Sequence, residues 1–123
     1  NLKSKMRIAV VSASKNCHFV LESAGILDLF DVKVDGRYAA EKNLPGKPAP
    51  DIFLEACKLL GLHPSVCLLF EDARAGVEAG KRGGFGLVIG VAREGPTERL
   101  LNSGADFVVE NLYQVEQKIK HHV

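Results

Sequence analysis

The sequence predicts an α/β fold, with a parallel sheet between two helical layers in a three-layer α/β/α arrangement. Short apolar runs such as Ile8–Val11 and Gly86–Val91 are rich in β-branched residues, a pattern typical of strands buried on both faces. Stretches with helical spacing of apolar residues separate these runs. Strands that alternate with helices imply right-handed crossovers and parallel pairing. We expect one domain over residues 1–123, because chains of this length commonly form one.

The first predicted unit is a strand, a loop and a helix. The strand Ile8–Val11 leads into a helix that begins near Lys15, and apolar residues at helical spacing continue to the segment Ala24–Leu27. A second strand, Phe30–Val34, follows about one crossover length after the first.

The second half continues the alternation. Pro50 is suited to a first helical turn, and an apolar stripe from Ile52 to Leu60 follows until Gly61 ends the helix. The remaining predicted elements are, in order, strand Val66–Phe70, helix Ala73–Arg82, strand Gly86–Val91, helix Pro96–Asn102, edge strand Phe107–Val109 and helix Leu112–Lys120.

Composition excludes some partners. The formal net charge is +1 and the 16 Lys and Arg are spread along the chain, so no nucleic-acid partner is expected. No run approaches the roughly 18 apolar residues of a membrane span. The three cysteines are an odd set without C-x-x-C spacing, which favours reduced thiols in a cytoplasmic protein.

The segment Ser12-Ala13-Ser14-Lys15-Asn16 follows the first buried strand. It places two hydroxyls, an ammonium and an amide at a strand-to-helix turn, where unpaired backbone N–H groups favour a phosphate. The alternative is that Ser14 only caps the following helix.

Lys47 and a pair of carboxylates complete the candidate site. Gly46 and Pro48 restrict the backbone on both sides of Lys47, although a single Lys before Pro is often an ordinary loop residue. Glu71 and Asp72 directly follow a buried strand, where carboxylate oxygens suit Mg²⁺. The alternative for Asp72 is that it caps the helix starting at Ala73.

The order and spacing of these motifs resemble the haloacid dehalogenase superfamily, and within it the β-phosphoglucomutase-like group. The resemblance rests on Ser-Ala-Ser-Lys-Asn at residues 12–16, Gly-Lys-Pro-Ala-Pro-Asp at 46–51 and Glu-Asp-x-x-Ala-Gly at 71–76. It covers residues 7 to about 109 and implies a Rossmann-like core. The stretch 34–46 also looks like the β-phosphoglucomutase-like domains found beside glycoside phosphorylases.

The resemblance implies roles for the site residues. Ser12 and Lys47 would be catalytic residues that bind the transferring phosphoryl group. Glu71 and Asp72 would hold Mg²⁺, and the segment 13–16 would bind the second phosphate of a sugar bisphosphate. The implied activity is that of β-phosphoglucomutase, which converts β-glucose 1-phosphate to glucose 6-phosphate through an aspartyl phosphate.

One part of this family's site is missing. The nucleophile is the first Asp of an Asp-x-Asp pair on the central strand, and no Asp-x-Asp occurs in this chain. We therefore expect residues 1–123 to be the C-terminal portion of a core domain, with a gap in mid-sheet, and to be inactive alone. Its partners would be a sugar phosphate and the missing N-terminal segment of the same protein. A sugar-phosphate phosphatase and a non-catalytic phosphate-binding module remain alternatives.

Overall fold

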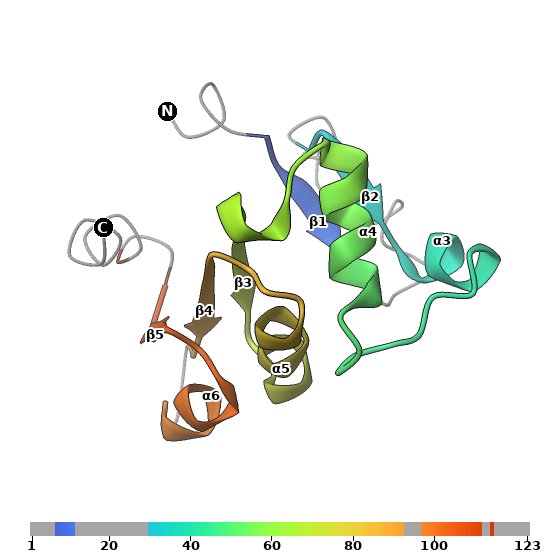
Figure 1. Ribbon diagram of the computed structural model, residues 1–123. Coiled ribbons are helices and arrows are strands. Elements are labelled where there is room, and N and C mark those ends of the chain that lie inside the picture. Colours follow the sequence, from blue (N-terminus) through green and yellow to red (C-terminus); the bar gives the residue numbers. More distant parts are fainter. Residues whose placement is uncertain (1–6, 12–29, 93–96, 112–113, 115–123) are drawn as a thin grey trace.

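The computed structural model describes residues 7–11, 30–92, 97–111 and 114 (Figure 1). Its elements, in chain order, are strand β1 (Ala9–Val11), strand β2 (Val32–Val34), helix α3 (Gly36–Glu41), helix α4 (Asp51–Leu60), a 3-10 turn η2 (Pro64–Val66), strand β3 (Leu68–Glu71), helix α5 (Arg74–Arg82), strand β4 (Leu87–Val91), helix α6 (Glu98–Ser103) and strand β5 (Phe107–Val109). This order confirms the predicted alternation of strands and helices. The helices predicted from Lys15 and over Leu112–Lys120 lie outside the described residues.

The strands form two separate parallel sheets. β1 pairs with β2, and β3, β4 and β5 pair in that order. Among the described residues, no ladder joins β1 to β3 (Figure 1). The parallel pairing confirms the predicted sheet, and the break falls between the two strands where a gap is expected.

Alternation of backbone groups identifies the inner edges of this break. The Ile8 carbonyl accepts hydrogen bonds from Asp31 and Val32 on the β2 side, so the next residue, Ala9, directs its N–H and C=O away from β2. The Cys67 carbonyl accepts from Gly86 on the β4 side, so the backbone groups of Leu68 point away from β4. β1 and β3 therefore each direct backbone N–H and C=O groups toward the break, and we call these two sides of the break the inner edges.

Helix α4 follows the predicted pattern closely. Pro50 is its N-cap, Asp51 stands in its first turn and Gly61 ends it in the left-handed conformation with φ 75°. Of the predicted apolar stripe, Ile52, Phe53, Ala56 and Leu60 are buried, together with Cys57, whereas the predicted stripe residue Leu59 is 46% exposed. α4 packs against β1, β2 and α5, so it links the two sheets.

The start of β3 differs from the prediction. The strand begins at Leu68 rather than Val66, because Pro64–Val66 forms a 3-10 turn. Pro64 suits the first position of such a turn, and the His63 ring accepts a hydrogen bond from the Ser65 amide. The sequence prediction missed this local cap.

Helix α3 was not predicted from the sequence. Asp35 caps it by accepting a hydrogen bond from the Tyr38 amide at 2.9 Å. The Tyr38 hydroxyl donates to Glu55 of α4, which raises the pKa of Tyr38. The signal was the Asp at the N-cap position, but a helix of six residues is too short for a clear apolar period.

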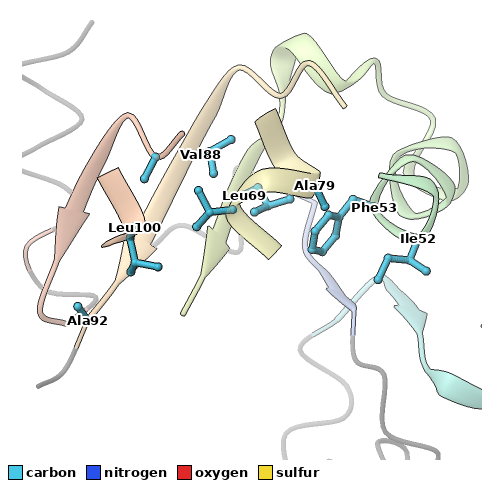
Figure 2. Close-up of a cluster of buried hydrophobic side chains, with 9 residues drawn as sticks. Ile52, Phe53, Leu69, Ala79, Val88, Ala92 and Leu100 are labelled. Carbon is cyan, nitrogen blue, oxygen red and sulfur yellow. The ribbon is translucent and has the colours of Figure 1, made fainter. Parts of the chain in front are cut away.

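The core lies mainly on one face of the larger sheet. Leu69 of β3 and Val88 of β4 face helices α4, α5 and α6, where they pack in a cluster with Phe53, Ala79 and Leu100 (Figure 2). The opposite face carries a second cluster, formed by Ile89, Phe107 and Val109 with Leu87 and Val91. Alternate residues thus serve two faces, as expected for a sheet covered on both sides.

Two cysteines lie side by side between α4 and β3. The sulfur atoms of Cys57 and Cys67 are 3.6 Å apart, and both are free thiols. Burial raises the pKa of Cys57 to about 12. The prediction of reduced cysteines holds for this pair, and Cys17 lies outside the described residues. No helix in the described ranges is long and apolar enough to cross a bilayer.

An aspartate fixes the start of each outer ladder. The Asp106 carboxylate accepts from the Val88 amide at 2.7 Å, while the Asp106 amide donates to the Val88 carbonyl at 2.8 Å. Asp31 forms the same pair of bonds with Ile8, both at 2.7 Å. Each aspartate stands one residue before its strand and thereby sets the register with the neighbouring strand.

We expect Asp106→Ala to lower the free energy of unfolding by about 1–3 kcal/mol, because the amide of the buried Val88 loses its partner. Asp106→Asn keeps an acceptor oxygen and should cost clearly less. Urea denaturation measures both free energies, provided that the protein used unfolds in a single cooperative transition. Equal losses in the two variants would contradict this role for Asp106.

Candidate functional site

The candidate site lies at the carboxyl end of β3. Glu71 is the last residue of β3, and Lys47 comes from the loop between α3 and α4. The Lys47 Nζ atom lies 3.0 Å from Glu71 Oε1, and the side chains are 24% and 12% exposed. The structure therefore brings together two of the predicted site residues that are 24 positions apart in the sequence.

Lys47 is oriented by more than one contact. Its Nζ atom lies 5.8 Å from the centre of the Phe53 ring, a distance typical of a cation–π interaction. Phe53 belongs to the first turn of α4 and is itself held edge-on against Phe85. The Lys47–Pro48 peptide bond is cis. The sequence identified Phe53 only as a core residue, because its position in the apolar stripe says nothing about its ring facing Lys47.

The Glu71 carboxylate also binds the chain that leads into α5. Its Oε2 atom accepts from the Asp72 amide at 2.8 Å and from the Ala73 amide at 3.3 Å. Oε1 faces Lys47, so each carboxylate oxygen has a donor. The Glu71 carboxylate therefore lies between the Lys47 ammonium and the amides at the start of α5.

Asp72 is exposed at the same strand end. It does not cap α5, because the N-cap residue is Ala73 and the cap has no side-chain hydrogen bond. The alternative interpretation of Asp72 as a helix cap is therefore wrong. α5 begins at Arg74, one residue later than predicted, since Ala73 has an extended backbone conformation.

The predicted phosphate-binding segment lies outside the part of the chain that the structure describes. It comprises Ser12, Ala13, Ser14, Lys15 and Asn16. β1 ends at Val11, so the segment follows a strand directly, as the sequence predicts. Its role in binding phosphate stays a prediction.

The donor set suits Mg²⁺ only in part. Glu71 and Asp72 offer hard carboxylate oxygens, and Mg²⁺ is commonly held by one or two carboxylates together with waters and substrate phosphate oxygens. Within residues 7–11, 30–92, 97–111 and 114, no three His, Cys, Asp or Glu side chains gather closely enough to hold a metal ion. The two carboxylates could therefore act only as part of a ligand set for Mg²⁺.

Comparison with known proteins identifies the family of this chain. The family model described as haloacid dehalogenase-like hydrolase matches residues 1–84. The chain therefore belongs to the haloacid dehalogenase-like hydrolase family, a family of enzymes. This confirms the family inferred from the motifs.

Individual relatives point to one group of the family. The chain is 42% identical over 111 residues to a β-phosphoglucomutase of Mycobacterium bovis, an alignment that covers 88% of this chain and 42% of that protein. A crystal structure of β-phosphoglucomutase from Clostridium difficile has a TM-score of 0.78 and 32% identity, over 97% of this chain and 51% of that one. These relatives confirm the β-phosphoglucomutase-like group.

A third relative is a much longer protein than this chain. An uncharacterized glycosyl hydrolase of Mycobacterium tuberculosis is 40% identical over 89% of this chain, and the match covers 8% of that protein. The chain spans less than half the length of the curated β-phosphoglucomutase that it matches.

We expect the Lys47–Glu71 ion pair to contribute a coupling free energy of about 1 kcal/mol, which is the upper end of the range measured for exposed ion pairs. The upper end is expected because these two side chains are less exposed to solvent than those of a surface pair. A double-mutant cycle with Lys47→Met and Glu71→Gln measures this value by urea denaturation. A matched cycle with Lys33→Met and Asp35→Asn, whose atoms are 3.9 Å apart, should give a smaller coupling. A coupling near zero for Lys47 and Glu71 would count against a fixed contact.

Proposed function

We propose that this chain is the C-terminal part of the core domain of a magnesium-dependent β-phosphoglucomutase. The observation that carries the proposal is the contact of Lys47 with Glu71 at the carboxyl end of β3. Ligands of parallel α/β sheets bind at that end of the strands. The β-phosphoglucomutase relatives support the choice of reaction.

Lys47 is proposed to bind the transferring phosphoryl group together with Ser12. At about 4 Å and an effective dielectric of about 20, its charge would attract one anionic charge by roughly 4 kcal/mol before desolvation. Phe53 and Glu71 restrict the lysine side chain, so less conformational freedom is lost when an anion binds. Ser14, Lys15 and Asn16, with the backbone at Ala13, are proposed to bind the second phosphate of the sugar.

Glu71 and Asp72 are proposed to hold Mg²⁺. When bound, the ion would neutralise charge on the phosphoryl oxygens. Asp72 is exposed and makes no ion pair with any residue that the structure describes, which leaves its oxygens accessible to a cation. Glu71 has hydrogen-bond donors at both oxygens, and these would orient its carboxylate beside the ion.

A segment preceding this chain is proposed to complete the sheet between β1 and β3. Its strand would carry the Asp-x-Asp pair that supplies the nucleophile and the general acid and base. Phe70 of β3 is 43% exposed, although strands of a parallel sheet are normally buried on both faces. An additional strand and its connections would cover this ring. The length of the relatives leaves room for such a segment.

A cytoplasmic location is part of the proposal. Cys57 and Cys67 are free thiols at 3.6 Å, and reducing compartments maintain thiols in that state.

The complete protein should convert β-glucose 1-phosphate to glucose 6-phosphate, measured by a coupled dehydrogenase assay with glucose 1,6-bisphosphate present. Lys47→Ala should lower kcat/KM by at least about 100-fold, as expected for the loss of a charged group that stabilises developing charge. Lys15→Ala should lower mutase turnover as well, because the second phosphate loses a cation.

The same assay separates the alternatives. If the protein releases inorganic phosphate from sugar phosphates, and Lys15→Ala does not change the rate of that release, the result would favour a phosphatase and contradict the mutase. Binding of glucose 6-phosphate without any turnover would favour a non-catalytic module.

Residues 1–123 alone should be inactive, because removal of a covalent nucleophile costs on the order of 10⁶ in rate. Added separately, the preceding segment of the protein should restore turnover and sharpen the amide NMR signals of Ala9 and Leu68, which lie at the inner edges. The same segment with its nucleophilic Asp changed to Asn is the control: it should restore the signals and no turnover. Full activity of residues 1–123 by themselves would overturn the proposal.

A further inference from the structure

Gly76 lies in the first turn of α5 and is buried against the side chain of Glu71. A Cβ atom at this position would lie 2.0 Å from Glu71 Cγ, 2.1 Å from Cδ and 2.4 Å from Oε1. Nonbonded carbon atoms attract one another best at about 3.5–4.0 Å, so such contacts are strongly repulsive. Any residue other than glycine at position 76 would therefore displace the Glu71 side chain.

The backbone offers Glu71 no simple way to yield. Glu71 pairs with Gly90 in the β3–β4 ladder, which fixes its Cα atom. The clash involves Cγ, so relief requires rotation about the Cα–Cβ bond. That rotation would carry the carboxylate away from Lys47 Nζ and from the amides of Asp72 and Ala73.

The other glycines of this region behave differently. A Cβ atom at Gly80, also in α5, would first meet Val88 and Leu69 at 3.0 and 3.2 Å, so Gly80 serves helix–sheet packing. A Cβ atom at Gly46, next to Lys47 in sequence, would meet nothing within 4 Å. Of these three glycines, only Gly76 leaves the space of its missing Cβ to a side chain of the candidate site.

We propose that Gly76 is a positioning residue whose missing side chain lets the Glu71 carboxylate lie between Lys47 and the start of α5. Glycine is a poor helix former, so its presence in the first turn of α5 needs a compensating reason. The space for Glu71 supplies that reason. The consequence for metal binding and turnover rests on the proposed function, whereas the steric relation does not.

The steric relation is tested by urea denaturation of the complete protein in metal-free buffer. Gly76→Ala should lower the unfolding midpoint in the wild-type background. In the Glu71→Ala background the same change should raise the midpoint or leave it unchanged, because the clash is gone and alanine favours the helix. Gly46→Ala should leave the midpoint unchanged in both backgrounds.

If Gly76→Ala lowered the unfolding midpoint by the same amount in both backgrounds, the proposal would be overturned. The loss of stability would then come from the backbone or from neighbours other than Glu71. A higher midpoint for Gly76→Ala in the wild-type background would overturn it as well.

A second readout tests the link to the metal. Gly76→Ala should raise the Mg²⁺ concentration needed for half-maximal mutase activity by about tenfold or more, as for changes that disturb the orientation of a metal ligand. At saturating Mg²⁺, much of kcat should return. Suppose that Gly76→Ala lowers the midpoint only when Glu71 is present but leaves the Mg²⁺ requirement unchanged. The link to metal binding would then be overturned, and the steric relation would stand. If the complete protein lacks mutase activity, the proposed function fails, and the midpoints still decide the role of Gly76.

Discussion

Backbone hydrogen bonding at the inner edges of β1 and β3 is the constraint on which the arrangement of this chain depends. A strand that is buried on its faces and unpaired at one edge retains polar groups that neither water nor the core satisfies well. In the described part of the chain, the two sheets are connected through α4 and through the contact of Lys47 with Glu71 rather than through a ladder. The candidate site residues therefore lie at the seam between the two sheets, beside α4, which packs on the smaller sheet and on α5.

The position of the seam explains why the candidate site combines charged side chains from distant parts of the sequence. Glu71 ends a strand of the larger sheet, whereas Lys47 precedes the helix that packs on the smaller one. The ion pair thus joins the larger sheet to the loop that enters α4. A phosphate bound near Lys47 would compete with Glu71 for the same ammonium, so binding at the site and cohesion across the seam are coupled.

Much of this arrangement could be predicted from the sequence. The β-branched runs and the helical stripe of α4 identified the strands and the longest described helix, because burial on both faces or on one stripe leaves a clear period. The start of β3 and helix α3 could not be predicted in the same way. Side chains of His63 and Asp35 determine them through local hydrogen bonds that leave no periodic signal.

The candidate site was predictable to a similar extent. Lys47 and Glu71 were named from their motifs and meet in the structure. Phe53 was named only as a core residue, and Gly76 only as the last residue of the motif at 71–76. The contribution of an aromatic ring beneath an ammonium, or of an absent side chain, depends on three-dimensional contact. Sequence spacing alone does not contain that contact.

The aspartates at residues 31 and 106 have a consequence for assembly. Each holds both backbone groups of one residue on the neighbouring strand, so the outer strands are aligned before anything occupies the seam. A strand entering between β1 and β3 would meet a β1 already aligned with β2 through Asp31, and a β3 aligned with β4 through their own ladder. A slip of one residue would turn its side chains to the opposite faces, so only one alignment would satisfy both neighbours. The two aspartates thus fix the register of the outer strand pairs, β1 with β2 and β4 with β5, independently of what lies between β1 and β3.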